Sequence, residues 1–175
     1  VSAANVTEPS DSEVELRMLL RQGERSGVLE ADEQEMIDKV FDFSDTSVEH
    51  VMVPRPDIAA LPVSLTPTAA MEQILQHPYT RYPVYEEELD NVLGVLHVRR
   101  LFVALQNGAG ASPDLRTLLY PPHLVPETKR LGHLLAEMRR QKSHMAIVVD
   151  EYGSVAGLVT LEDLLEEIVG EIDDE

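Results

Sequence analysis

The fold is decided by one stretch of the chain, residues 144–165, which reads HMAIVVDEYGSVAGLVTLEDLL. Two apolar, partly β-branched runs at 145–149 and 155–159 flank an acidic turn, and this pattern predicts a β-hairpin. From Leu161 onward the apolar residues recur at helical spacing, which predicts a helix directly after the second strand. A strand, a turn, a strand and a helix are therefore expected here in immediate succession.

Thr160 and Asp163 lie at the predicted junction between that second strand and the helix. The start of a helix has free backbone N–H groups and a dipole that favours anions, and a carboxylate there can accept hydrogen bonds from both hydroxyls of a ribose. The same spacing also suits an N-cap hydroxyl followed by an acid in the first turn, which requires no ligand. Taken alone, the pair favours the helix cap, because capping pairs are common.

The hairpin and helix belong to an internal duplication. Residues 92–102 align without a gap on residues 155–165, and Gly94 and Gly157 illustrate the constant offset of 63 positions between the copies. Each copy reads as a short strand, a helix, two strands joined by an acidic turn, and a second helix. Repeats that cannot close their own cores must bury their sheets against each other, so the predicted fold class is α/β with two small sheets packed by helices. The copies are expected to join at 108–113, a stretch rich in Gly and Ala.

The region before the duplication is polar and charged. Residues 1–12 are small and polar, and we expect them to be disordered. Residues 13–45 contain two short amphipathic stretches, the first ending by Gly27 and the second covering 31–43 with Asp32 placed to cap it. Two thin helices of this kind predict a connector rather than an independently folded unit.

Composition excludes several classes of protein. The formal net charge of −18, from 32 acidic and 14 basic residues, argues against a nucleic-acid partner, because phosphate neutralisation requires clustered Lys and Arg. The absence of Cys excludes disulfides, thiolate zinc sites and cysteine nucleophiles. The longest apolar run, 145–149, is far shorter than the roughly 20 residues that span a bilayer, and no signal-peptide pattern opens the chain, so a soluble chain is expected.

No pattern typical of catalysis or of a metal site is present. The six histidines stand at no metal-site spacing from acidic residues, and the chain has no Ser/His/Asp set, paired-carboxylate cleft or Gly-rich phosphate loop. The acidic residues within 166–175 offer the oxygen ligands that Mg²⁺ prefers, but a run of charges is more often a solvated helix face. We therefore expect a protein that is not an enzyme and has no metal ligands of its own.

Five blocks of the sequence carry a resemblance to a known family. They are VEHVMVPR at 48–55, YTRYPV at 79–84, VPETKR at 125–130, HMAIVVDE at 144–151 and GLVTLEDLLEEIVGEI at 157–172. In this order they resemble the cystathionine-β-synthase (CBS) domain. The closer resemblance is to the CorC/HlyC family of magnesium and cobalt transport proteins and to their animal relatives, the CNNM mediators. Residues 16–37 also resemble the helical connector of longer family members, so the resemblance covers nearly everything after residue 13.

The resemblance implies tandem CBS domains, a Bateman module, preceded by a helical connector. The corresponding organisation is a polar start at 1–12, the connector at 13–45, a first CBS motif at 46–108, a second at 109–172 and an acidic end at 173–175. It further implies a regulatory module that binds AMP or ATP, with or without Mg²⁺ on the nucleotide. In longer family members this module lies at the cytoplasmic face of the membrane, between a membrane transport domain and a C-terminal transporter-associated domain.

The resemblance also implies a set of ligand-binding residues. They are Thr160, Asp163, Tyr79, Thr80, Arg81, Val125, Pro126, Met145 and Ala146. The family's ribose-binding acid falls on Asp163, and its Thr beside the nucleotide falls on Thr160. The block at 79–81 corresponds to residues that face the phosphates, and the segments 125–126 and 145–146 correspond to residues that contact adenine.

One residue of this set and two departures from the family pattern bear on ligand binding. Arg81 can pair with phosphate through its planar donors, and without the family context it is equally well a surface Arg beside the acids at 86–88. In the first copy the Thr and Asp positions hold His97 and Arg100, and since Arg cannot accept hydrogen bonds from a ribose, that copy is expected to have lost its nucleotide site. Many family members have Thr where this chain has Val53, so one hydroxyl contact to the ligand is expected to be missing.

Two hypotheses of function follow. In the first, the chain is a sensor whose bound nucleotide changes the geometry of a dimer coupled to a transporter. In the second, it is a structural dimerisation module with a vestigial nucleotide site. The Thr-x-x-Asp pair survives in one copy only, and such selective loss favours the sensor. A homodimer is expected through helices of both motifs, at 65–75, 101–105, 131–138 and 161–168.

Overall fold

The computed structural model describes residues 11–107 and 114–170. The predicted join at 108–113, the acidic end at 173–175 and residues 1–10 lie outside the described residues. In chain order the helices are α1 (Asp11–Arg25), α2 (Ala31–Asp45), α3 (Pro67–Ile74), α4 (Val98–Gln106), α5 (Leu131–Gln141) and α6 (Leu161–Val169). The strands are β1 (Val53–Pro54), β2 (Leu61–Pro62), β3 (Arg81–Tyr85), β4 (Val92–His97), β5 (Leu119–Tyr120), β6 (Leu124–Pro126), β7 (Met145–Val149) and β8 (Val155–Thr160).

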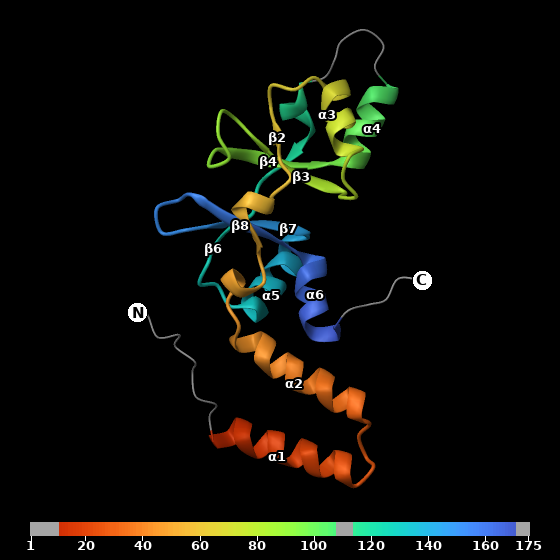
Figure 1. Cartoon of the computed structure of the whole chain (residues 1–175), viewed down its shortest axis with the longest axis vertical. Helices are drawn as coiled ribbons and strands as arrows, with labels where there is room; N and C mark the ends of the chain where they lie inside the picture. Colours follow the sequence, from red (N-terminus) through yellow and green to blue (C-terminus); the bar gives the residue numbers. More distant parts are fainter. Residues whose placement is uncertain (1–10, 108–113, 171–175) are drawn as a thin grey trace.

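The duplication appears as two copies of one unit. The first copy is β2, α3, β3, β4 and α4, and the second is β6, α5, β7, β8 and α6. They form two four-stranded sheets, with strand orders β2-β3-β4-β5 and β1-β8-β7-β6. Figure 1 shows the sheets next to each other in the middle of the molecule, with α3 and α4 beyond one sheet and α5 and α6 beyond the other. The α/β fold class, with two small sheets packed by helices, is confirmed.

The two sheets bury their facing sides against each other, as the duplication predicts. Val95 of β4 packs there against Met145 and Ile147 of β7 and Leu158 of β8. Each of these side chains is no more than 7% exposed. Neither sheet could cover this face alone, and burial of apolar surface favours the paired arrangement by about 25 cal/mol per Å².

Each copy also completes its sheet with a short strand that belongs to the other half of the chain. β1 pairs antiparallel with β8, so that Val53 stands opposite Leu158, and β5 pairs antiparallel with β4 of the first copy. The close approach requires a glycine in each inner strand. A Cβ atom on Gly157 would lie 2.5 Å from the carbonyl oxygen of Val53, and one on Gly94 would lie 2.5 Å from that of Tyr120.

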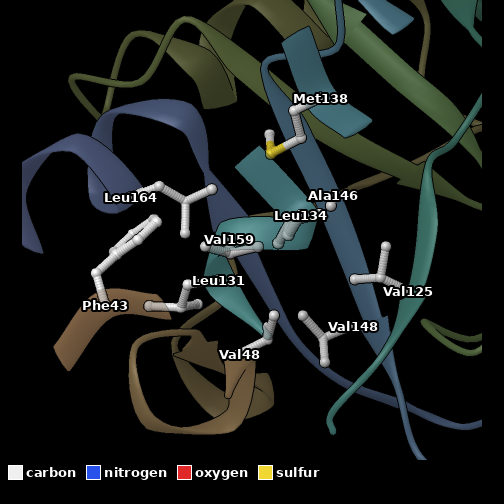
Figure 2. Packing of buried hydrophobic residues seen from close by; sticks show 10 residues of the cluster. All are labelled: Phe43, Val48, Val125, Leu131, Leu134, Met138, Ala146, Val148, Val159 and Leu164. Carbon is white, nitrogen blue, oxygen red and sulfur yellow. The ribbon is translucent and has the colours of Figure 1, made fainter. Parts of the chain in front are cut away.

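The connector helix α2 is part of the core of the second motif. Figure 2 shows Phe43 of α2 packed beside Leu131 of α5 and Leu164 of α6, and all three side chains are buried. The helix begins after Glu30, whose N–H donates to the Glu33 carboxylate at 3.1 Å, so Asp32 is not the cap that the sequence indicated.

The other connector helix, α1, lies against α2. Arg17 donates a hydrogen bond to Asp42 at 2.9 Å and holds its guanidinium over the Phe41 ring. The first helical turn already includes Asp11 and Ser12, which the sequence analysis assigned to the polar start. Within the described ranges, no helix is both long and apolar enough to cross a membrane.

Candidate functional site

The first cavity lies where the ends of both sheets meet, and its volume is about 290 Å³. Three parts of the chain converge on it: the segment between β1 and β2, the segment that enters β3, and the junction of β8 with α6. Its lining residues are Val53, Asp57, Ile58, Ala59, Pro78, Tyr79, Thr80, Arg81, Met145, Leu158, Thr160, Glu162 and Asp163. The cavity therefore belongs to both motifs rather than to one.

Six of the nine predicted site residues line this cavity together: Tyr79, Thr80, Arg81, Met145, Thr160 and Asp163. The structure does not bring the other three there. Val125 and Ala146 are buried in the core between the second sheet and its helices, and Pro126 ends the edge strand β6. The lining of the first cavity therefore does not include these three residues: Val125 and Ala146 pack into the core, and Pro126 is exposed at the edge of the sheet.

Asp57, Ile58, Ala59 and Pro78 line the cavity although the sequence analysis did not select them. The first three follow directly on the block at 48–55, and they reach the cavity because β1 pairs with β8 of the other motif. A pairing between strands of two residues leaves no periodicity to detect. The signal that was available was the neighbouring Val53, which itself lines the cavity and presents an apolar side chain there.

Thr160 and Asp163 form a reciprocal cap at the start of α6. The Thr160 hydroxyl accepts the N–H of Asp163 at 3.2 Å, and Asp163 Oδ2 accepts the N–H of Thr160 at 2.7 Å. The cap interpretation is thus confirmed as geometry. It does not consume the carboxylate, because Asp163 Oδ1 makes no hydrogen bond within the part of the chain that the structure describes, and both residues still line the cavity.

Arg81 begins β3 and is half-buried at the cavity wall. Its Nη1 atom lies 3.9 Å from Glu162 Oε1 and 3.4 Å from the Thr80 hydroxyl. Both contacts are long, so most of the five donors of the guanidinium stay available to an anion. The acids at 86–88 are not its partners in the described structure, where Glu86 pairs with Arg116 instead.

The wall that carries Val53 and Ile58 is fixed by a charged clamp. Arg55 forms an ion pair with Asp90 and donates to the carbonyl of Val155 at 2.8 Å, while Asp90 accepts the N–H of Val155 at 2.8 Å. The hydrogen bond from Arg55 lowers the pKa of Asp90 below its usual value, and the bond from Val155 acts in the same direction. The clamp joins the β1 segment, the turn of the first motif and the hairpin of the second.

A second cavity of about 480 Å³ occupies the corresponding place in the first motif. Its lining residues are Arg81, Val95, His97, Tyr120, Pro121, Pro122, His123, Gln141, Lys142, Ser143, His144 and Met145. Two of them, Arg81 and Met145, also line the first cavity, so the two cavities share a wall.

His97 replaces Thr160 in this copy and takes over its structural role. The His97 Nδ1 atom accepts the N–H of Arg99 at 3.1 Å and so caps α4. Burial lowers the pKa of His97, and the nearby Arg81, Arg99 and His144 lower it further. Arg100, at the position of Asp163, places its guanidinium over the Tyr120 ring, 4.7 Å from the centroid. No carboxylate lines this cavity in the described residues.

The comparisons with known proteins agree with this architecture. The model of the CBS domain family matches residues 45–107 and 116–170. The magnesium and cobalt efflux protein CorC of Pasteurella multocida is 38% identical over 161 residues, which are 92% of this chain and 53% of that protein. Curated relatives with 40% identity are matched over 39% of their length, so the chain spans about half or less of these proteins.

Two solved structures give the same result in three dimensions. The CBS domain of the bacterial CNNM/CorC family Mg²⁺ transporter matches with a TM-score of 0.86 at 39% identity, over 93% of this chain and 98% of that one. The same domain in complex with ATP matches with a TM-score of 0.74 at 40% identity, over 80% of this chain and 99% of that one.

Fold, duplication and sequence together define the class: the chain belongs to the CBS-domain family and is a pair of CBS domains. Within this class it is a CBS-domain pair of the CorC/CNNM type, as the resemblance predicted.

Proposed function

We propose that this chain is a regulatory module that binds an adenosine nucleotide, AMP or ATP, in the first cavity. The observation that carries the proposal is the convergence of Thr160 and Asp163 from the second motif with Arg81 from the first. An acceptor for ribose hydroxyls and a guanidinium for phosphate then line one cavity of suitable size. The ATP complex of the related CBS domain supports this choice of ligand.

The residues of the first cavity have distinct proposed roles. Asp163 accepts the ribose hydroxyls through Oδ1, and Thr160 holds the start of α6 beside the ligand. Arg81, with Tyr79 and Thr80, faces the phosphates. Ile58 and Ala59, together with Met145, supply apolar and backbone contacts to the adenine ring, in place of Val125 and Ala146, which pack in the core.

Because the ligand would touch both motifs at once, its binding would stabilise one relative placement of the two sheets. A ligand shifts a conformational equilibrium only by its difference in affinity for the two states, and a site shared by two motifs provides such a difference. The role is therefore regulatory rather than catalytic. Mg²⁺ would bind together with the nucleotide phosphates. Asp57 and Glu162 are acidic residues of the lining that would offer it oxygen ligands.

In the longer protein, we place the module at the cytoplasmic face of the membrane, beside a membrane transport domain for magnesium or cobalt and a C-terminal transporter-associated domain. The CorC relative supports this context, since the chain corresponds to about half of it. The motif boundaries 46–108 and 109–172 and the connector 13–45 are part of this proposal. The packing of α2 against α5 and α6 supports a mechanical link from the connector into the second motif.

The module is proposed to act as a homodimer. Large apolar side chains stay exposed on the outer helices, among them Leu75 after α3, Phe102 on α4, and Leu165 and Val169 on α6. A second copy would cover such surface. We expect light scattering to give twice the 19.5 kDa monomer mass over a range of concentrations, and a mass that stays at the monomer value would contradict the dimer.

The exposed helix faces also favour the second candidate function, a structural dimerisation module with a vestigial nucleotide site. One calorimetric titration separates the two candidates. AMP, ADP and ATP are titrated into the chain with and without Mg²⁺, and the sensor requires saturable binding of one nucleotide per chain. Absence of binding by all three nucleotides would leave the dimerisation module, and saturation at two equivalent nucleotides would show that the first motif has kept its site.

A further inference from the structure

The second cavity has the same walls as the first but the opposite charge. Residues of the first cavity, including the start of α6, can be compared with their equivalents 63 positions away at the second cavity and the start of α4. The pairs are Tyr79 and Lys142, Arg81 and His144, Thr160 and His97, Glu162 and Arg99, and Asp163 and Arg100. A site that contains acids thus becomes one whose titratable lining groups are Arg81, Lys142, three histidines and Tyr120, with no acid among the described residues of the lining. In a chain of net charge −18, this is an isolated cationic cavity.

A buried histidine in the lining, His123, has one ring nitrogen without a partner in the described residues. His123 is only 8% exposed, and its Nδ1 atom makes no hydrogen bond within the described residues. Glu137 Oε1 faces His123 Nε2 at 3.4 Å while Glu137 Oε2 pairs with Lys129, and the hydrogen bond from Lys129, together with the nearby His123, lowers the pKa of that carboxyl. Buried polar atoms are nearly always paired in folded proteins, and Nδ1 is the ring nitrogen of His123 that is available to a ligand in the cavity.

We propose that the second cavity binds the phosphate groups of a small polyphosphate anion. Lys142 of the lining supplies a positive charge, and Arg81, in the wall shared with the first cavity, supplies the planar donors of its guanidinium. His123 supplies a ring nitrogen from the buried part of the lining. A nucleoside is not the recognised part of the ligand, because no carboxylate stands ready for ribose and Arg100 is stacked on Tyr120. The residues tested for this site, Lys142 and His123, do not line the first cavity.

Two sources can deliver this chemistry: a free inorganic polyphosphate, or the phosphate tail of a nucleotide whose adenosine occupies the first cavity and whose tail passes the shared Arg81. The test uses inorganic tripolyphosphate, ATP and adenosine as probes, in calorimetric titrations of the full chain at low salt, since screening weakens charge-assisted binding. Tripolyphosphate binding to the wild-type chain would identify the free anion. If ATP binds more tightly than adenosine and this difference in affinity depends on Lys142, the ligand is the phosphate tail of the nucleotide.

The decisive variant is Lys142→Asn. Lys142 has a φ of 56°, in the left-handed region, and Asn tolerates this backbone while removing the charge. We expect it to weaken the phosphate probe about tenfold or more, the range of one charge-assisted hydrogen bond. The matched control, Arg140→Gln, removes one exposed charge from the last turn of α5 outside the cavity and should change binding less than about twofold.

A second measurement, NMR of the histidine rings, shows where the phosphate probe binds. Tripolyphosphate or ATP should shift the ring resonances of His123, which is buried and remote from non-specific surface binding. If tripolyphosphate does not bind and ATP affinity does not depend on Lys142, or if Lys142→Asn and Arg140→Gln weaken the phosphate probes equally, the second cavity is not a phosphate site. Nucleotide binding in the first cavity would survive that result, because Asp163→Asn rather than Lys142→Asn tests it.

Discussion

The starts of α6 and α4 occupy equivalent places in the two motifs, and they differ in what they keep. At α6 the Thr160 hydroxyl accepts a backbone N–H, and at α4 the His97 imidazole does the same at nearly the same distance. Only α6 adds a carboxylate, that of Asp163, whereas Arg100 of α4 turns onto Tyr120. The comparison teaches that a helix cap and a ligand acceptor are separable requirements, because one copy has kept the first and lost the second.

Because β1 pairs with β8 and β5 pairs with β4, each cavity depends on a strand from the other half of the chain. Gly157 and Gly94, where these strands approach most closely, are the positions at which a substitution should disturb the pairing most. In Gly157→Ala the new Cβ would lie 2.5 Å from the Val53 carbonyl oxygen and 2.7 Å from Met52 Sδ. β1 must then move away from β8, so we expect the free energy of unfolding, measured in urea, to fall by about 2–3 kcal/mol.

Two further glycine variants sharpen this result. Gly132→Ala in α5 is the control, since its Cβ would meet nothing closer than 3.8 Å and Ala favours the helix. Gly94→Ala, with its Cβ 2.5 Å from the Tyr120 carbonyl oxygen, should cost as much as Gly157→Ala but should disturb the second cavity instead of the first. If Gly157→Ala unfolds at the same urea concentration as Gly132→Ala, the close approach is not a constraint.

The difference between the two helix starts is broken most directly at Asp163. Asp163→Asn keeps the size of the side chain but replaces an anionic acceptor by an amide, so we expect ATP and AMP to bind about ten- to a hundredfold more weakly by calorimetry. Loss of part of the cap should cost on the order of 1 kcal/mol of stability, which a melting curve without ligand will show as a small shift.

The matched variant on the other side of the comparison is Arg100→Asn, which changes the corresponding position of α4. It should leave nucleotide affinity within about twofold, because Arg100 lines neither cavity and is exposed. Equal affinities in well-folded wild-type and Asp163→Asn proteins would mean that the Thr160–Asp163 pair is only a helix cap, and the dimerisation module would then be the better account of the chain.

Much of this architecture could be predicted from the sequence, because it is carried by periodic signals. The hairpin and helix at 144–165 have strong alternation and helical spacing, and the duplication at a constant offset transferred them to the first copy. The same signals placed Thr160 at the strand–helix junction, where the structure has it.

The parts that the sequence did not reveal are those without a period. β1 and β5 are two residues each, and they are held by partners more than 100 positions away for β1 and more than 20 positions away for β5, rather than by local pattern. The residues that follow β1 therefore went unselected, and the adenine contacts were assigned to Val125 and Ala146, whose apolar character reflects core packing. A family block indicates that a segment matters, but a β-strand presents alternate residues to opposite sides, and only the fold decides which side meets the cavity.

Arg81 is the residue that the two cavities share, and its replacement tests how phosphate is held. Arg81→Ala should weaken ATP about tenfold by calorimetry while adenosine, which has no phosphate, changes little. Arg140→Gln is a suitable control, since it removes an exposed positive charge that lines neither cavity. If ATP and adenosine lose affinity equally in Arg81→Ala, the side chain shapes the cavity without contacting phosphate.

The smallest expected effect is on the pH dependence of thermal stability, which should distinguish the His97 cap of α4 from the Thr160 cap of α6. Burial, together with the electrostatic effect of the nearby Arg81, Arg99 and His144, lowers the pKa of His97 in the folded chain. The unfolded chain therefore binds a proton more readily than the folded one, so this group's contribution to stability is fully present above the ordinary histidine pKa of about 6.5 and is lost as the pH falls below it. Protonation of Nδ1 would also remove the acceptor that caps α4.

In His97→Asn, an amide oxygen can cap the helix at every pH. Between pH 7 and pH 5 the wild-type chain should lose more thermal stability than His97→Asn, whereas Thr160→Asn should follow the wild-type slope, because Thr160 does not titrate. Parallel slopes for the wild-type and His97→Asn proteins would show that the cap of the first motif does not respond to pH, and the two helix starts would then differ only in the ligand that they favour.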